Sequence, residues 1–291
     1  MRTTPLLFFF LLTINLFAQE KKDTASIKSY TRYSSILQED RYIEVYAPFT
    51  AKSSTKQAYE VIYILDGAAH FTNVIDILKQ LARETGDASF TQKIVVGIGN
   101  IWTRDRDYTP TTITSSPFVE EGAAKVSGGG EKFIAFLKKE LIPFVDSLYP
   151  AGTNRVLIGH SLGGLIAVHI LLHHTGLFNK YAAIDPSMWW DNQTLLHQSK
   201  KILVQKSFAN NNLFLAIANT RNKDISDAVQ LRKDTSRNTA LNRPALLLAD
   251  NVLAAGKNNL RFNWQYYKDF DHMSVFRPAT YDALKFLLKT R

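Results

Sequence analysis

The hydrophobic positions of this chain form short apolar runs that alternate with segments of helical periodicity. A near-continuous apolar run predicts a strand buried on both faces, whereas a run with alternating polar positions predicts a strand with one exposed face. The first kind occurs at 59–65, 93–98, 156–158, 181–184 and 213–218, and the second at 35–37, 41–48 and 260–267. Helical spacing of apolar residues occurs at 73–85, 131–148, 243–255 and 278–288, and a further helix is expected directly after residue 161.

Strands that alternate with helices, without an internal repeat, predict an open and mostly parallel α/β sheet with an antiparallel start. Residues 21–30 are predicted to be a polar lead-in, and 99–130 a long irregular loop. Pro143 lies inside the predicted helix 131–148, so we expect a kink or a break there. Ligands of such sheets bind at the carboxyl ends of the strands.

The first 18 residues differ from the rest of the chain. A basic start at Met1-Arg2 precedes an apolar run from Pro5 to Phe17, and the chain turns polar after Ala18. This pattern is typical of a secretory signal peptide, and the apolar run is too short for a comfortable transmembrane span. We therefore expect a signal peptide at 1–18, a single domain at 19–291 without stable membrane insertion, and a periplasmic or secreted protein. An uncleaved membrane anchor is the alternative.

Composition and charge narrow the chemistry further. The chain has 291 residues, is 45% hydrophobic and contains no cysteine, which allows one large core and excludes disulfides, thiolate metal sites and a cysteine nucleophile. Its net charge of +9 comes from scattered basic residues, so we expect a solvated basic surface and no nucleic-acid partner. Attraction of anionic substrates or envelope surfaces is the alternative. No metal or nucleotide motif is present, so no cofactor is expected.

The stretch 155–167 is the clearest candidate for chemistry. It places the motif Gly-His-Ser-Leu-Gly, at 159–163, between an apolar strand and a predicted helix. A Gly-x-Ser-x-Gly turn in this context is a nucleophile elbow, in which a serine with positive φ needs neighbours without bulk. We predict that Ser161 is the nucleophile, that Gly159 and Gly163 supply the space, and that the N–H of Leu162 stabilises an oxyanion.

A serine hydroxyl needs a base, which follows the nucleophile in the chain order of this fold. His272 is the best placed histidine, because it follows the last predicted strand and precedes the last helix. Asp224 lies a short loop beyond the strand 213–218 and is predicted to be the acid that orients His272, with Asp227 as the reserve. Asp185 also follows a strand, but the proline after it fits a strand-ending turn, so we interpret it as structural. A Ser–His dyad is a further alternative.

The second oxyanion donor of such a fold comes from the loop after an early central strand. The segment Leu65-Asp66-Gly67-Ala68 occupies this place, so we predict that Ala68 contributes its N–H. His70 is nearby and is a further candidate for substrate contact. The side chain of His160 is expected to point away from the nucleophile. The other histidines near the elbow, at 169, 173 and 174, are predicted to be ordinary residues on or just after its helix.

Several segments together resemble one known family. They are 65–67, 104–110, 128–133, 159–164, 187–190 and 271–275. They resemble the putative esterase family, which includes esterase D, the enterochelin and salmochelin esterases, feruloyl and acetylxylan esterases, and the mycolyltransferases. The resemblance covers nearly the whole mature chain and implies an α/β-hydrolase fold without a large cap, a serine nucleophile, a strand-end acid and a late histidine. The mycolyltransferases support the roles of Ala68 and Asp224, whereas Met273 replaces a glycine of many relatives and is expected to narrow the pocket mouth.

The resemblance implies an exported serine esterase that works through an acyl-enzyme. Siderophore esters such as catecholate trilactones are the first substrate class, and feruloyl or acetyl esters on polysaccharides the second. Arg104 or Arg106 is a candidate contact for an anionic or catecholate group, and Tyr108, Trp189 and Trp190 for an aromatic or sugar group. A salt-bridged loop with buried tryptophans is the alternative. A non-catalytic binding protein of the same fold and a serine peptidase are the other function classes, and the oligomeric state is unknown.

Overall fold

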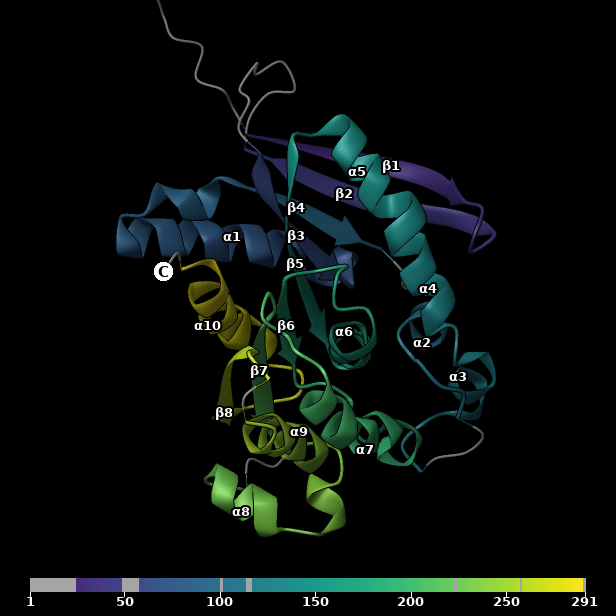
Figure 1. Cartoon of the computed structure of the whole chain (residues 1–291), viewed down its shortest axis with the longest axis vertical. Helices are drawn as coiled ribbons and strands as arrows, with labels where there is room; N and C mark the ends of the chain where they lie inside the picture. Colours follow the sequence, from purple (N-terminus) through teal and green to yellow (C-terminus); the bar gives the residue numbers. More distant parts are fainter. Residues whose placement is uncertain are drawn as a thin grey trace, which may run out of the picture.

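The structure is a computed structural model that describes residues 25–48, 58–99, 102–113, 117–221, 224–256 and 258–289. The predicted signal peptide at 1–18 lies outside these residues. Eight described strands form one sheet in the order β1-β2-β4-β3-β5-β6-β7-β8 (Figure 1). Their bounds are β1 Ser26–Ser34, β2 Glu39–Ala47, β3 Tyr59–Leu65, β4 Lys93–Ile98, β5 Ala151–His160, β6 Lys180–Ile184, β7 Asn212–Asn219 and β8 Arg261–Asp271.

Only β2 runs against the other described strands of this sheet. It pairs antiparallel with β1 on one side and with β4 on the other, whereas every pair from β4 to β8 is parallel. This confirms the predicted parallel sheet with an antiparallel start. The prediction of a polar lead-in at 21–30 was wrong in its second half, because β1 is a mostly exposed edge strand. This strand has no apolar run that would mark it in the sequence. It is defined by its backbone hydrogen bonds to β2.

Helices cover both faces of the sheet, as Figure 1 shows. The helices α1 and α10 lie on one face, and α4 to α7 and α9 lie on the other. The α-helices are α1 Gly67–Thr85, α2 Arg104–Asp107, α3 Glu121–Val126, α4 Gly130–Phe136, α5 Ile142–Leu148, α6 Leu162–His173, α7 Trp190–Gln205, α8 Ala228–Lys233, α9 Arg243–Ala254 and α10 Phe276–Leu288. Short 3₁₀ turns span Ala88–Thr91 and Arg237–Thr239, and a π-helical turn spans Leu137–Leu141.

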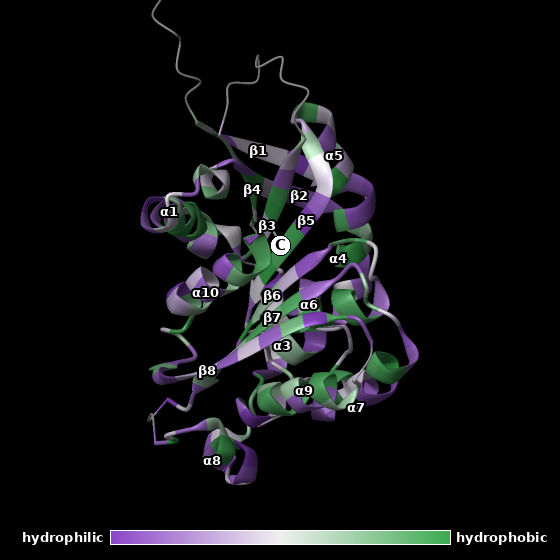
Figure 2. Cartoon of the chain, turned by 60° about the vertical axis from the view of Figure 1, so that its left-hand side comes forward, coloured by the Kyte–Doolittle hydropathy of each residue, from purple (hydrophilic) through white to green (hydrophobic). Residues whose placement is uncertain are grey.

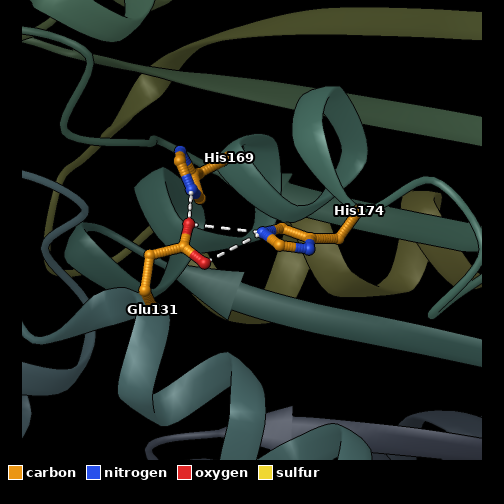
Figure 3. A group of neighbouring side chains, drawn as sticks. All are labelled: Glu131, His169 and His174. Carbon is orange, nitrogen blue, oxygen red and sulfur yellow. Dashed lines mark hydrogen bonds and ion pairs between the residues drawn. The ribbon is translucent and has the colours of Figure 1, made fainter.

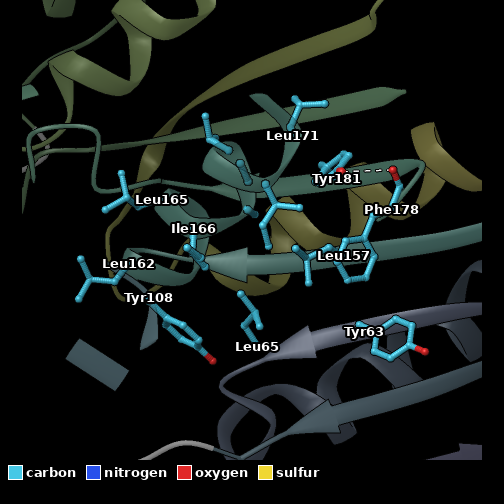
Figure 4. Close-up of a cluster of buried hydrophobic side chains, with 14 of the residues drawn as sticks. Tyr63, Leu65, Tyr108, Leu157, Leu162, Leu165, Ile166, Leu171, Phe178 and Tyr181 are labelled. Carbon is cyan, nitrogen blue, oxygen red and sulfur yellow. Dashed lines mark hydrogen bonds between the residues drawn. The ribbon is translucent and has the colours of Figure 1, made fainter. Parts of the chain in front are cut away.

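Two apolar clusters fill the space between the sheet and its helix layers. Val61, Tyr63 and Leu65 of β3 pack on the side of α4 to α6, whereas Ile62 and Ile64 pack against α1 and α10. Successive side chains of a strand point to opposite faces, so a strand covered on both sides needs apolar residues throughout. Figure 2 shows this hydrophobic concentration in the central strands, and Figure 4 shows part of the first cluster.

The predicted helix 131–148 contains a π-helical turn just before Pro143, where a kink or a break is expected, and the backbone keeps helical angles at both ends of this turn. The helix α4 ends at Phe136, the π-helical turn follows, and α5 begins at Ile142 with the proline in its first turn. A proline is tolerated there because its missing N–H would have no acceptor within α5.

The loop predicted at 99–130 is less irregular than its sequence indicates, since it includes α2 and α3. The segments of the described chain that leave the two layers carry α2, α3 and α8, each of which has at most 6 residues. This agrees with the expected fold without a large cap. In the described part of the chain, no helix is both long enough and apolar enough to cross a membrane.

Ser161 lies on the sharp turn between β5 and α6. Its backbone has φ 60° and ψ −120°, the strained conformation that a nucleophile elbow requires. A Cβ at Gly159 would lie 2.1 Å from the carbonyl oxygen of Gly163, and a Cβ at Gly164 would lie 2.9 Å from Cα of Pro186. A Cβ at Gly163 would meet nothing closer than 3.5 Å. The close packing of the turn around Ser161 therefore requires a glycine at 159, as predicted. It also requires one at 164, and not at 163 as predicted.

We predict that Gly159→Ala destabilises the protein by about 3 kcal/mol or more, because the added methyl group meets backbone that cannot move away. Urea unfolding followed by circular dichroism measures the change. Gly163→Ala is the matched control and is expected to leave stability unchanged or raise it by about 0.5–1 kcal/mol, since alanine favours a helix. Equal unfolding midpoints for the Gly159→Ala variant and the wild type would contradict this account of the turn.

Candidate active site

Three reactive side chains lie at the carboxyl edge of the sheet. Ser161 follows β5, Asp185 follows β6, and His272 follows β8. The Nδ1 atom of His272 lies 2.5 Å from Oδ2 of Asp185. An ionised carboxylate can only accept, so Nδ1 carries the proton and Nε2 of a neutral ring is free to act as a base. Ser161 and His272 line the same two cavities.

Asp185 is fixed in place by its surroundings. The residue is 4% exposed, and its Oδ1 accepts the N–H of Ala218 at 3.0 Å. Its Oδ2 accepts a second hydrogen bond from Nδ2 of Asn242 at 3.3 Å. The backbone of Asp185 has a φ of 41° and donates its N–H to the carbonyl oxygen of Ala216 at 2.8 Å. The carboxylate is thus oriented toward His272 before any substrate binds, which is the geometry of the acid in a Ser-His-Asp triad.

Asp224, the acid predicted from the sequence, does not occupy this position. Its Oδ1 accepts a hydrogen bond from the hydroxyl group of Thr220. The reserve candidate, Asp227, caps α8 by accepting the N–H groups of Val229 and Gln230 at 2.8 and 2.9 Å. Neither carboxylate is the partner of His272 in the described structure. The prediction that Asp224 orients His272 is therefore wrong, and Asp185 has this place.

The order of the strands explains this error. β6 lies directly beside β5 in the sheet, and β7 lies one strand further from the nucleophile. The end of β7 itself holds Asn219, whose Nδ2 donates to the carbonyl oxygens of Ile225 and Lys268. The strand-ending turn at Asp185, which we interpreted as structural, is the feature that aims its carboxylate. An aspartate directly after the buried strand that follows the nucleophile is the signal that could have identified it.

His160 supports the loop that carries His272. Its Nε2 lies 2.8 Å from the carbonyl oxygen of His272, which can only accept, so Nε2 carries the proton. Burial, reinforced by the neighbouring His272, lowers the pKa of His160 to about 3, so the ring is neutral at ordinary pH. From the other side, Oδ1 of Asp271 accepts the N–H groups of Met273 and Ser274 at 3.1 and 3.0 Å. Sequence reasoning gave His160 no role, although it is held beside the predicted base.

The two predicted oxyanion donors lie at helix N-termini near Ser161. Leu162 is the first residue of α6, and Ala68 is the second residue of α1. N–H groups at these positions have no acceptor within their own helix. Ala68 lines a cavity together with Ser161. A Cβ at Gly67 would lie 2.7 Å from the backbone of β4, so the glycine allows α1 to begin this close to the sheet edge.

The segment 104–110 holds the loop before α1. Nε of Arg104 donates to both carboxylate oxygens of Asp66 at 3.0 and 3.1 Å, and Nη2 donates to the carbonyl oxygen of His160 at 3.1 Å. The hydroxyl group of Tyr108 accepts the N–H of Asp66 at 2.9 Å. Burial raises the pKa of Asp66, and the charge of Arg104 opposes that rise. Arg104 still lines the cavity, but Tyr108 is fully buried, so its predicted substrate contact is wrong.

Arg106 belongs to an ion-pair network instead of the cavity wall. Its Nη2 lies 2.6 Å from a carboxylate oxygen of Glu39 and 2.8 Å from one of Asp107. Asp107 is fully buried and also pairs with Arg41 at 2.7 Å. Arg106 therefore belongs to a salt-bridged loop, which was the alternative to a substrate contact.

The two tryptophans predicted as substrate contacts have different surroundings. Trp189 is half-buried, lines the cavity that includes Asp185, and packs edge to face on Phe118 with ring centroids 5.7 Å apart. Trp190 is buried, and its indole N–H donates to the carbonyl oxygen of Thr111 at 3.1 Å. Trp189 remains a candidate contact, whereas the prediction for Trp190 is wrong.

The cavities beside Ser161 share part of their walls. One has a volume of about 630 Å³ and includes the start of α1, and the other has about 430 Å³ and includes Trp189 and Arg221. Met273 lines both cavities and is 77% exposed, so it borders the space around the serine. His70 lines the larger cavity and stacks on Phe276, and burial lowers its pKa to about 4.

A third cavity adjoins the larger one at Ala68. It has a volume of about 500 Å³ and includes Trp102, which is 95% exposed. Trp102 could not be identified from the sequence. A single tryptophan in a loop has no sequence pattern that shows whether its ring is exposed or buried.

The chain is similar to known proteins over most of its length. Residues 34–286 match the profile of the family described as "Putative esterase". The siderophore enterobactin esterase of Emericella nidulans is 26% identical over 270 residues, which cover 84% of this chain and 88% of that protein. The ferri-bacillibactin esterase BesA of Bacillus subtilis is 25% identical over 256 residues, which cover 84% of each chain.

Solved structures share the fold. An IroE-like serine hydrolase from Shewanella oneidensis superposes with a TM-score of 0.78 and 30% identity, covering 89% of this chain and 79% of that chain. The siderophore hydrolase EstA from Aspergillus nidulans gives a TM-score of 0.72 and 24% identity, covering 89% and 93%. These similarities confirm the predicted α/β-hydrolase fold.

Asp185→Asn is expected to lower kcat/KM for p-nitrophenyl acetate by about 10³–10⁴-fold, because an amide no longer holds His272 in the required tautomer. Asp224→Asn is the matched control and is expected to stay within about threefold of the wild type, as a surface change away from the reacting atoms does. Steady-state kinetics at pH 7.5 decide between the two carboxylates. A larger loss in Asp224→Asn would restore the acid predicted from the sequence, and wild-type activity in both variants would indicate a Ser–His dyad.

Proposed function

The chain belongs to the putative esterase family and is a carboxylic ester hydrolase, and on this premise we propose that it cleaves siderophore esters through an acyl-enzyme on Ser161. One observation carries the mechanism: the hydrogen-bonded pair of Asp185 and His272 lies at the wall of a cavity that Ser161 also lines. A nucleophile, a base and an orienting acid in this arrangement are the components of acyl transfer.

In the acylation step, Oγ of Ser161 attacks the ester carbonyl carbon while Nε2 of His272 takes the hydroxyl proton. Asp185 stabilises the resulting imidazolium. The N–H groups of Leu162 and Ala68 bind the negative oxygen of the tetrahedral intermediate, and loss of one such donor typically costs about 10²–10³-fold in kcat. The intermediate then collapses, and the departing alcohol oxygen takes the proton from His272.

In the deacylation step, His272 removes a proton from a water molecule, whose oxygen attacks the acyl-enzyme carbonyl. The same two N–H groups bind the second oxyanion, and collapse releases the acid and returns the proton to Ser161. In the free enzyme, Oγ of Ser161 lies 3.3 Å from Oγ of Ser187. We propose that the hydroxyl group turns from this weak contact toward His272 when the substrate binds.

Siderophore esters are the substrate class that the relatives favour. Two of them are named as esterases of enterobactin and of ferri-bacillibactin. The cavities on this chain provide room on more than one side of Ser161, which suits a large lactone ring with bulky arms. Arg104 and Arg221 line these cavities, and the chain carries a net charge of +9, so an anionic catecholate would be attracted.

The signal-like residues 1–18 support export as a further part of the proposal. A siderophore esterase that is periplasmic or secreted would meet its substrate outside the cytoplasm, as a small molecule or as an ester on a glycan. Fusion of residues 1–24 to a reporter enzyme that is active only outside the cytoplasm tests this localisation.

Ser161→Ala is expected to abolish hydrolysis of p-nitrophenyl acetate and of a catecholate trilactone, by at least about 10⁴-fold, without lowering the unfolding midpoint. Product release measured by chromatography, with a feruloylated sugar and a peptide amide in parallel, identifies the preferred substrate class. A preference for the feruloylated or acetylated sugar would replace siderophores with polysaccharide esters, and faster cleavage of the amide would indicate a peptidase. Full activity of Ser161→Ala would overturn the role of Ser161 as nucleophile, and an inactive wild type would support a binding protein instead.

Trp102 is a proposed platform for the catechol ring. Its exposed indole beside Ala68 is placed to stack on an aromatic arm of a substrate, and such a contact contributes about 0.5–1.5 kcal/mol. We therefore expect Trp102→Ala to raise KM for a catecholate trilactone about 3- to 10-fold with little change in kcat. Trp102→Phe should retain most of the affinity, and p-nitrophenyl acetate is the control substrate. An unchanged KM for the trilactone would remove Trp102 from the binding site.

A further inference from the structure

Three side chains outside the active site converge in the manner of metal ligands. Glu131 lies in the first turn of α4, and His169 and His174 lie in α6 and directly after it (Figure 3). Nε2 of His169 is 2.8 Å from Oε1 of Glu131, and Nε2 of His174 is 3.2 Å from the same oxygen. One ligand atom from each of the three residues lies within 4.8 Å of the other two.

These separations are close to those of a bound divalent ion. Zinc binds imidazole nitrogen and carboxylate oxygen at about 2.0–2.2 Å, which places tetrahedral ligand atoms about 3.4 Å apart. The site needs little rearrangement to reach this spacing, because the side chain of Glu131 is 60% exposed and can shift, while His169 and His174 are only 11% and 33% exposed. Two semi-rigid imidazoles and one adjustable carboxylate are thus already assembled.

The convergence is more specific than a surface ion pair. Both rings direct the same atom, Nε2, at one carboxylate, and the histidines are at least 38 positions from Glu131 in the sequence. Two imidazoles and one carboxylate, with open positions for water, form a ligand set typical of zinc and of other first-row divalent ions. No metal motif is visible in the sequence at this place, because the spacing of residues along one helix does not reveal a ligand from another helix.

We propose that Glu131, His169 and His174 bind a divalent transition-metal ion such as Zn²⁺, with water completing the coordination. The site is structural. His169 is eight residues beyond Ser161 in the same helix, which corresponds to about 12 Å along its axis, too far for contact with the reacting ester. The ion would connect the start of α4 to the end of the nucleophile helix.

This connection has a consequence for the loop that supports the oxyanion donor. The glycines before α4 are joined to the segment 104–110, since the N–H of Gly129 donates to the carbonyl oxygen of Arg106 and that of Gly128 to Oγ1 of Thr109. The same segment holds Asp66 through Arg104 and Tyr108. A bound ion therefore braces the segment at its far end and raises the stability of the fold without changing the chemistry.

The affinity is expected to be moderate. Nδ1 of His169 is buried and has no hydrogen-bond partner among the described residues. A metal-bound Nε2 leaves a proton on Nδ1, and the absence of an acceptor for that proton typically weakens metal binding about 10- to 100-fold. We therefore expect micromolar binding of Zn²⁺, well short of the affinity of a closed four-ligand structural site.

Titration of the tag-free protein with Zn²⁺ in a calorimeter tests the proposal. One equivalent is expected to bind to the wild type and to raise Tm by about 5 °C at a hundredfold excess over Kd. Glu131→Gln and His174→Ala remove ligands that are exposed or half-exposed, so both variants should fold, and each should weaken binding at least tenfold. His197→Ala, which removes an exposed histidine of α7 outside the cluster, is the matched control and should bind as the wild type does.

Co²⁺ provides a second readout, because an ion held by two imidazoles and a carboxylate in a four-coordinate site gives a strong visible absorption band. That band should be present in the wild type and in His197→Ala, and absent in Glu131→Gln. Ester hydrolysis by Glu131→Gln should match that of the wild type, so the outcome is independent of the catalytic proposal. Absence of Zn²⁺ binding, or equal Kd values in wild type, Glu131→Gln and His174→Ala, would overturn the assignment.

Discussion

The hydrogen bond between Asp185 and His272 is the interaction on which the site depends, and it spans three strands. The carboxylate is at the end of β6, the histidine follows β8, and the strand between them contributes the N–H of Ala218 to the other carboxylate oxygen. A parallel sheet places these three strand ends at one edge. The end of β7 therefore holds both the backbone and the carboxylate of Asp185, and Asn242 adds a further hydrogen bond to this carboxylate.

The close approach of backbone segments is the second constraint, and it acts at the two helix N-termini that carry the proposed oxyanion donors. Gly159 and Gly164 allow α6 to begin directly beneath Ser161, and Gly67 allows α1 to begin against β4. Each helix then presents free N–H groups at its N-terminus close to the serine. The strain of the turn at Ser161 and of the αL residue Asp66 is balanced by packing and by the hydrogen bonds of Arg104 and Tyr108.

Most of the fold could be predicted from the sequence, and so could two of the three residues of the candidate site. Buried strands such as 59–65 and 93–98 coincide with β3 and β4, because two-sided burial leaves a clear apolar run. The edge strand β1 could not be predicted, since its pairing with β2 is a tertiary contact with no local signature. Ser161 and His272 could be selected by chain order, but the choice between Asp185 and Asp224 required the lateral order of the strands. Chain order does not encode that lateral order.

The candidate substrate contacts show a more general limit of prediction from the sequence. Arg104, Tyr108 and Trp190 have the chemistry to bind a catecholate or an aromatic ring, and the sequence places them near strand ends. The same chemistry is used here to hold a loop, because a strained backbone such as that of Asp66 needs donors and acceptors as much as a ligand does. A polar or aromatic side chain can point toward the substrate or toward the protein interior. The direction depends on which neighbouring groups of the folded chain need a hydrogen-bond partner. Only the three-dimensional arrangement supplies that information, and it assigns Tyr108 to the scaffold while leaving Trp102 and Trp189 to the cavities.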